Sequence, residues 1–222
     1  NPVITGGNAV FTKLNPVSAT NTLTISDVVG DGETFTIGDD VYEFCADAAQ
    51  SLTEGSTIAV DIEAKTTKAS GTLTVATNPT AGQALVIGGV TYTFRALADF
   101  DSAGEILLGS NAAATQANII AAIMGTDGEN EPDANVTIGA FTTNAATVTA
   151  KVGGTGGNSI TTTDTLSGSD GFTGGTLGSG ADCSAANAAL AAITAINANS
   201  TNGVTAVTGG SGVVNITATA GA

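Results

Sequence analysis

The hydrophobic and polar residues of this chain alternate in the same pattern twice. Residues 22–44 read TLTISDVVGDGETFTIGDDVYEF, and residues 72–94, fifty positions later, read TLTVATNPTAGQALVIGGVTYTF. In both stretches apolar residues occupy every second position of three short runs, which is the pattern of strands with one buried face. Glycines and aspartates separate the runs, as in tight turns. Each copy therefore predicts a three-stranded β-meander with one apolar face.

The two copies align without a gap. Their identical pairs are Thr22/Thr72, Leu23/Leu73, Thr24/Thr74, Gly32/Gly82, Ile37/Ile87, Gly38/Gly88, Tyr42/Tyr92 and Phe44/Phe94. An internal repeat of this kind indicates that one supersecondary unit is used twice.

A helix and two further strands follow the second copy. Residues 110–124 read SNAAATQANIIAAIM, where the opening Ser-Asn pair supplies the cap and three isoleucines form the apolar stripe. Those isoleucines are Ile119, Ile120 and Ile123. Two alternating stretches, residues 135–141 and 146–152, then predict strands.

The first copy has no such continuation, but a matching one occurs at the end of the chain. Residues 182–198 read DCSAANAALAAITAINA, a second alanine-rich helix followed by strand-like stretches at 203–207 and 213–222. The inward positions predicted for this helix are Leu190, Ala191, Ile193 and Ile196. Pairs that match at a constant offset are Val136/Val204, Thr137/Thr205, Thr149/Thr217, Ala150/Ala218 and Gly153/Gly221.

These offsets predict a nested arrangement. An arm, residues 1–19, precedes module one, which consists of residues 20–67 plus 178–222; module two, residues 68–177, is inserted into it. An exposed connection tolerates such an insertion at low cost. The predicted class is α+β, β-dominated, each module being a β-meander covered by one alanine-rich helix plus a further hairpin. A tandem array with two incomplete modules is the alternative.

The nested arrangement bears on the cysteines. Cys45 ends the last meander strand of module one, and Cys183 opens the helix expected to cover that strand. We therefore predict a disulfide between them, worth about 3–5 kcal/mol in the chain-entropy picture, and an oxidising or extracellular location. Two buried thiols that never meet are the alternative.

The arm matches neither module. Its sequence NPVITGGNAVFTKLNPVSA contains short apolar pieces between prolines and glycines, with Val3, Ile4, Val10 and Phe11 as candidate assembly contacts. Attachment to a capsid or a neighbouring subunit is one interpretation. An edge strand on module one is the other, and the sequence favours neither.

Charge and composition narrow the classes of partner. The chain has 222 residues and a net charge of −15, which disfavours nucleic acid and anionic membranes as partners. No apolar run approaches the about 18 residues of a membrane-spanning helix. Aromatic residues make up 4% of the chain, so its cores must consist mainly of small aliphatic side chains.

Candidate chemistry is sparse. The chain has no histidine, and we predict no catalytic, cofactor-binding or metal-ligating residues and no enzymatic activity. The glycine-rich stretch Gly153–Asn158 lacks the lysine and following helix of a phosphate loop and is interpreted as a mobile turn. Acidic residues at 127, 129, 131 and 133 could offer oxygens to Ca²⁺, but their spacing differs from an EF-hand and favours a solvated loop.

The order GTLTV, AGQALVIGGVTYTF, GSNAAATQANIIAAI, VTAKVGGTGGNSI resembles a module that recurs in virion proteins of tailed bacteriophages. The residues that carry the resemblance are Gly88, Tyr92, Phe94, Ala112 to Ala114, Ala121 to Ile123 and Gly154 to Asn158. It covers module two almost whole and module one in split form. The insertion, the cysteines and the arm depart from it.

The resemblance implies a structural role without catalytic residues: a capsid decoration protein, a head-fibre subunit or a tail component. We expect an outer capsid decoration or head-fibre subunit at the virion surface, in contact with the major capsid protein or other virion subunits. A homo-oligomer is expected, and a trimer fits this class of assembly. The alternative from another class is a secreted bacterial adhesin or surface-layer module that binds Ca²⁺.

Overall fold

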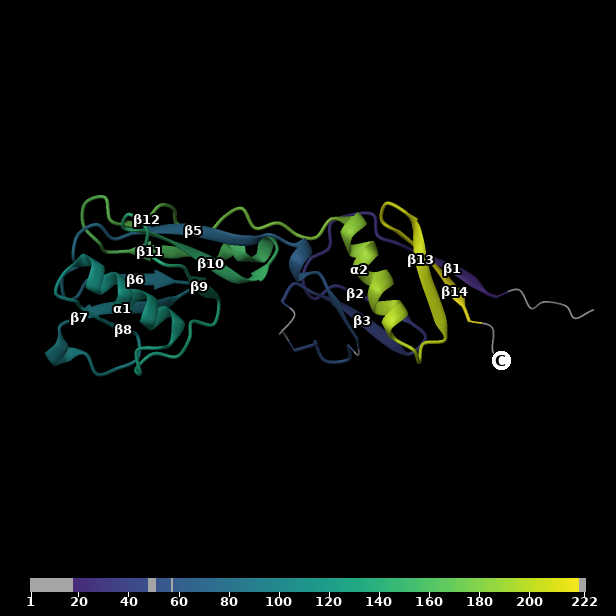
Figure 1. Ribbon diagram of the computed structural model, residues 1–222, viewed down its shortest axis with the longest axis horizontal. Helices are drawn as coiled ribbons and strands as arrows, with labels where there is room; N and C mark the ends of the chain where they lie inside the picture. Colours follow the sequence, from purple (N-terminus) through teal and green to yellow (C-terminus); the bar gives the residue numbers. More distant parts are fainter. Residues whose placement is uncertain (1–17, 48–50, 57, 220–222) are drawn as a thin grey trace, which may run out of the picture.

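The computed structural model describes residues 18–47, 51–56 and 58–219. Within these ranges, fourteen strands form four sheets and two α-helices accompany them, so the predicted α+β, β-dominated class is confirmed. The elements form two groups placed end to end along the long axis of the molecule (Figure 1).

Each group has its own hydrophobic core. One cluster of buried side chains lies between Val29 and Ile62 and between Cys183 and Val214, and the other lies between Ala69 and Leu177. We call the residues around the first cluster, 18–67 and 178–219, lobe one. We call residues 68–177 lobe two.

Lobe two contains two four-stranded sheets. The first has the order β12-β5-β10-β9 and is antiparallel throughout, and the second has the order β11-β6-β7-β8, in which β7 and β8 are parallel. The strands are β5 (Lys68–Thr74), β6 (Ala84–Ile87), β7 (Val90–Arg95), β8 (Glu105–Leu107), β9 (Val136–Ile138), β10 (Ala145–Gly153), β11 (Thr162–Asp164) and β12 (Gly171–Phe172).

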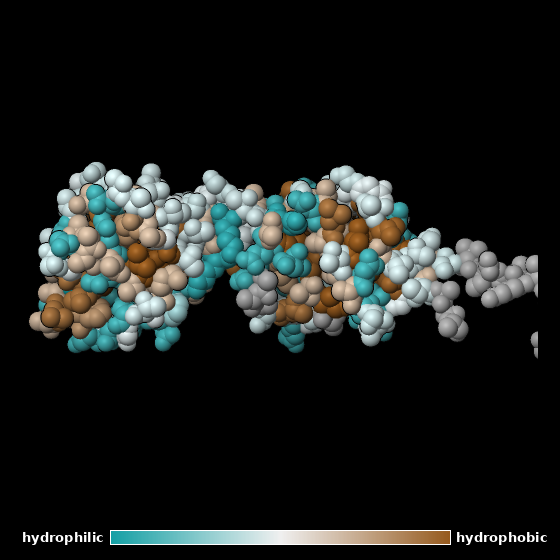
Figure 2. Space-filling view, in the orientation of Figure 1, coloured by the Kyte–Doolittle hydropathy of each residue, from teal (hydrophilic) through white to brown (hydrophobic). Residues whose placement is uncertain are grey.

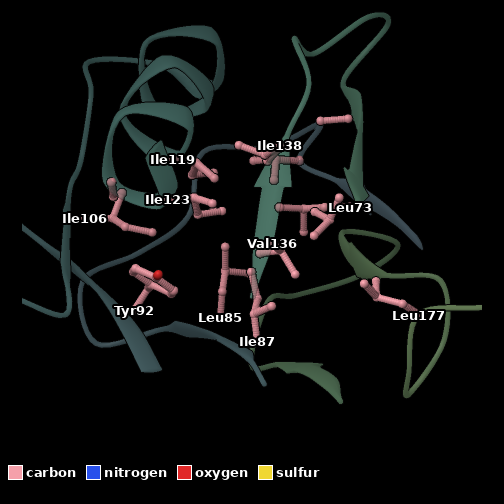
Figure 3. Close-up of a cluster of buried hydrophobic side chains, with 14 of the residues drawn as sticks. Leu73, Leu85, Ile87, Tyr92, Ile106, Ile119, Ile123, Val136, Ile138 and Leu177 are labelled. Atoms are coloured by element: carbon pink, nitrogen blue, oxygen red, sulfur yellow. The ribbon is translucent and has the colours of Figure 1, made fainter. Parts of the chain in front are cut away.

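Helix α1 (Ala112–Met124) closes the core of lobe two. Asn111 caps its first turn by accepting a hydrogen bond from Ala114 N, and Gly125 ends it in the left-handed conformation at φ 67°. Ile119 and Ile123 point from the helix toward Leu85 (Figure 3). All three side chains have no exposed surface, so the helix covers the apolar sides of both sheets.

Lobe one has two three-stranded sheets with the orders β1-β14-β13 and β2-β3-β4. Its strands are β1 (Thr20–Thr24), β2 (Thr34–Ile37), β3 (Asp40–Cys45), β4 (Ile58–Asp61), β13 (Val204–Gly210) and β14 (Val213–Ala218). β1 pairs with β14 as β5 pairs with β10 in lobe two, and β3 and β4 are parallel, as are β7 and β8. Helix α2 (Ala185–Ala198) packs on β4, β13 and β14.

The predicted meanders are wrong in one respect. The strand that opens each repeat does not pair with the next strand along the chain, because β1 pairs with β14 and β5 pairs with β10. Gly32 does not turn β1 into β2; instead its N–H donates to Phe44 O at the end of β3. The long connection after β1 therefore carries the chain to the other sheet.

The inward face of α2 also differs from the expected one. Ala188, Ala192 and Ile196 form a buried stripe four residues apart, whereas Leu190, expected inward, is 54% exposed. Leu190 lies two residues, or about 200° around the helix, from both Ala188 and Ala192, and it therefore points away from the sheet.

The lobes are joined by two antiparallel stretches of chain. Thr67 and Ala181 form a β-bridge, and the short 3₁₀ helix η1 (Glu63–Lys65) precedes it. Two other 3₁₀ helices, η2 (Leu97–Asp99) and η3 (Thr155–Ser159), lie in lobe two. The chain thus enters and leaves lobe two side by side.

Candidate functional site

A recess lies on lobe one, between the edges of its two sheets. It is an open groove of about 510 Å³ between β1 and β2. Its apolar lining consists of Leu23, Phe35, Ile37, Val204 and Ile216, all partly exposed. The groove is therefore a surface on which apolar side chains are incompletely covered.

The local sequence explains how these side chains reach the groove. In β2 the alternation Thr-Phe-Thr-Ile turns Phe35 and Ile37 inward and the threonines to solvent. Phe35 stacks on Tyr42 of β3, with ring centroids 4.8 Å apart and nearly parallel planes. This stacking holds the aromatic side of the groove in place.

Lobe two has the same apolar positions without a groove. The residues that correspond to the lining by their sequence offset are Leu73, Leu85, Ile87, Val136 and Val148, and all of them have 0% exposed surface. The difference has a visible cause. In lobe two β11 pairs with the outer edge of β6 and β12 with that of β5, whereas no described strand pairs with the outer edges of β1 and β2.

Hydrophobic side chains also appear on the outer surface of lobe one, over α2 and β13 (Figure 2). Leu190 of α2 and Val207 of β13 are 54% and 58% exposed. Isolated exposed apolar residues are common on proteins, so these two do not mark a site by themselves.

Several carboxylates bind the backbone of this chain itself. Glu43 has no exposed surface and accepts hydrogen bonds from Thr53 N at 2.8 Å and Thr53 Oγ1 at 2.7 Å. The hydroxyl hydrogen bonds of Thr53 and Ser56 hold the pKa of Glu43 below its ordinary value. Asp170 likewise accepts from the backbone N–H groups of Ala76 and Thr77. These acids fasten loops to strands.

The acidic stretch at residues 127–133, whose carboxylates could offer oxygens to Ca²⁺, is held in the same way. Asp127 Oδ1 accepts from Asn130 N at 2.9 Å, and Asp133 Oδ1 accepts from Val136 N at 3.1 Å. The Tyr92 hydroxyl donates to Asp133 Oδ2 at 2.8 Å. Burial, and then this hydrogen bond, raise the pKa of Tyr92. Nowhere in the described ranges do three or more metal-binding side chains gather.

The predicted disulfide between Cys45 and Cys183 is not present, because both thiols are free and buried. Tyr42 and Phe44 of β3 point into the core of lobe one, to which Cys183 belongs. Cys45 follows Phe44 in the strand and therefore points to the opposite face, where its thiol donates to Glu43 O at 3.5 Å. Burial raises the pKa of both thiols.

The glycine-rich stretch expected to be a mobile turn has a defined structural role. Asn158 exchanges two hydrogen bonds with Gly180, at 2.8 and 3.0 Å. Asp182 accepts from Thr155 N and Thr155 Oγ1 at 2.7 and 2.8 Å. This stretch therefore binds the segment that returns from lobe two to lobe one.

The candidate assembly residues Val3, Ile4, Val10 and Phe11 lie outside the described residues. The groove itself was missed by the sequence analysis. The signal that could have revealed it is the stretch 160–177, which follows β10 and supplies the edge strands β11 and β12 of lobe two.

Comparison of the chain with protein-family models, curated proteins and solved structures finds no match. No helix in the described ranges has the length and apolarity needed to cross a membrane.

Proposed function

We propose that this protein is a structural subunit of a tailed-bacteriophage virion that acts by protein–protein assembly on the outer surface of the capsid, as a decoration or head-fibre subunit. The observation that carries the proposal is the use of its acidic side chains as hydrogen-bond acceptors within the fold. Glu43, Asp133 and Asp170 all bind groups of the chain itself and thereby hold loops in fixed positions. These carboxylates therefore stabilise the fold itself.

The sequence and the shape add further support. The resemblance to virion modules covers lobe two almost whole and lobe one in split form. The molecule is elongated, with two β-rich lobes in line (Figure 1). The net charge of −15 disfavours contact with nucleic acid and suits a particle exterior, since like charges keep particles dispersed.

We further propose that the lobes are two copies of one module, with residues 68–177 inserted into the module formed by residues 20–67 and 178–222. The order of strand pairing supports this, because β1, β14 and the β2-β3-β4 sheet correspond to β5, β10 and β6-β7-β8. The partners would be the major capsid protein, other virion subunits or further copies of this chain.

Labelling of native particles tests the virion role. Antibodies raised against this chain would be applied to particles purified from its source and viewed by negative-stain electron microscopy. Regularly spaced label on the head is the expected result, and label on the tail would move the subunit to a tail component. Recovery of the chain only on bacterial cell surfaces or as free protein would refute the proposal. Antibody preabsorbed with the purified chain serves as the control.

A further inference from the structure

We propose that the groove between β1 and β2 is a docking surface for residues 1–17 of the same chain, which complete lobe one as residues 160–177 complete lobe two. The inference concerns how a single copy closes its own core. It goes beyond the proposed virion role and does not depend on it.

Lobe two shows what a filled groove looks like. Thr162 of β11 lies opposite Ile87 of β6, and Phe172 of β12 lies opposite Leu73 of β5. A bridge between Thr161 and Thr176 joins the two added strands to each other. The two sheets of lobe two are thus linked by a pair of short strands along their facing edges.

Apolar side chains of this added segment cover the core. Ile160, Leu166 and Phe172 pack against the cluster, and Leu177 is part of it. Asp164 holds the connection between the two strands by accepting hydrogen bonds from Leu166 N and Phe172 N. The residues beneath are completely buried, whereas their lobe-one counterparts lining the groove are partly exposed.

Among the described residues, lobe one therefore has two open strand edges beside an apolar floor that is partly exposed. Edges with unpaired N–H and C=O groups readily accept a further strand, whose backbone supplies hydrogen bonds and whose alternate side chains fill the groove. Covering the floor is also favoured by the hydrophobic effect. The two features together favour binding of an extended segment in which apolar residues alternate with polar ones.

Residues 1–17 are the occupant that the chain itself offers. The groove lining begins at Ala19, where the described chain starts its pairing, with Ala218 N donating to Ala19 O at 2.8 Å. A segment tethered at the mouth of the groove has an effective concentration on the order of millimolar without any partner molecule. Docking of residues 1–17 within the same chain is therefore favoured over docking from a second copy.

The sequence before β1 fits a return along its outer edge. Residues 15–18 read Asn-Pro-Val-Ser, with asparagine and proline in the first two positions that a type I turn favours. A two-residue turn at Pro16 and Val17 places Val10 opposite Leu23. Phe172 holds the corresponding place opposite Leu73 in lobe two. Beyond Gly6 and Gly7, a second apolar pair, Val3 and Ile4, is available for the edge of β2.

Hydrogen exchange measured by mass spectrometry tests the docking. The full chain would be compared with a variant lacking residues 1–17. The inference predicts that amides of β1 and β2 exchange about tenfold or more faster in the deletion variant, while those of β9 and β10 in lobe two are unchanged. Adding a synthetic peptide of residues 1–17 to the deletion variant should restore the protection. Equal exchange in the full chain and the deletion variant would overturn the proposal.

A pair of point variants in the full chain covers the case in which the deletion variant does not fold. In the proposed register Val10 faces the groove and Ala9 faces outward. Val10→Asp should expose the amides of β1 and β2, whereas Ala9→Asp, with the same added charge, should not. Equal exchange in the two variants would overturn the register and the docking with it.

The molar mass determines which copy supplies the segment. Light scattering coupled to size exclusion, from low to high micromolar protein, gives the molar mass at each concentration used for hydrogen exchange. The amides of β1 and β2 should be protected where the protein is a monomer. Protection that appears only in a dimer and is lost on dilution would overturn docking within one chain and would identify a neighbouring copy as the donor. The virion role would be unaffected by either outcome.

Discussion

Several acidic side chains in this protein hold loops in place through hydrogen bonds. Glu43 holds Thr53, Asp170 holds the turn after β5, and Asp133 holds both Tyr92 and the start of β9. A charged acceptor gives a stronger hydrogen bond than a neutral one, which is why carboxylates recur at these places. The contribution of such a carboxylate to the unfolding free energy can be measured.

Glu43 should make stability depend on acid pH. Its pKa is lower in the folded chain than in the unfolded chain, so its stabilising effect is complete above the unfolded value of about 4.3 and is lost as the pH falls below it. Urea unfolding at pH 7 and pH 3.5 should show a smaller loss of unfolding free energy in Glu43→Gln than in the native chain. Identical losses in the two proteins would contradict the role of this carboxylate.

Both cysteines should be detected as thiols. In denaturant without reductant, a thiol reagent such as dithiobis(nitrobenzoate) should titrate two thiols per chain, which is all the cysteine present. In the folded protein both should react slowly, because burial and a raised pKa suppress the reactive thiolate. Fewer than two thiols after denaturation would show that a disulfide forms after all.

At the scale of elements, local signals predicted well what depends on neighbours in sequence. The helix expected at residues 110–124 begins only two residues later, at Ala112, and ends at the expected Met124. Its inward isoleucines were identified because Ile119 and Ile123 lie on one helical face. The β9–β10 and β13–β14 hairpins were also predicted.

What local signals did not determine is pairing between distant strands. Leu23 alternates correctly for a strand, but nothing in its neighbourhood shows that its partner is Val214. The face of Cys45 was missed because it depends on which side of β3 is covered. The groove was missed because it depends on β11 and β12, which pair with strands that lie far from them in the sequence and cover the corresponding edges in lobe two.

The cap of α1 gives an element-scale prediction. Asn111 Oδ1 accepts from Ala114 N at 3.0 Å, so Asn111→Ala should lower the unfolding free energy of lobe two by about 1 kcal/mol. The neighbouring variant Ser110→Ala is the matched control and should be nearly neutral, since Ser110 makes only a long contact to Asn111 at 3.4 Å. Denaturant melts followed by circular dichroism measure both. A larger loss for Ser110→Ala would assign the cap to that residue.

For the whole molecule, the relation of the two lobes depends on a small joint. Asp182, in the segment that returns from lobe two, accepts two hydrogen bonds from Thr155 of lobe two. Gly154 is required there, because a Cβ at this position would lie 2.6 Å from Asp182 Oδ1. Together with the bridge between Thr67 and Ala181, these contacts set the angle between the lobes.

Asp182→Ala should therefore let the two lobes move relative to each other while both stay folded. Small-angle X-ray scattering is expected to show a broader distribution of interlobe distances, with circular dichroism unchanged. Asp99→Ala, which removes the same charge from an exposed residue of η2, should leave the scattering curve as it is. A scattering curve unchanged in Asp182→Ala would show that the bridge alone fixes the joint.

The antiparallel pairing of Thr20 with Thr217 also determines how the molecule would respond to mechanical force. A pull applied at residues 20 and 217 meets β1 and β14 at the same end, so their hydrogen bonds would break one after another, as in a zipper. Lobe two lies between β4 and α2 along the chain, and it carries no tension until lobe one has opened. Under load the chain would therefore extend in two steps, and lobe two would open last.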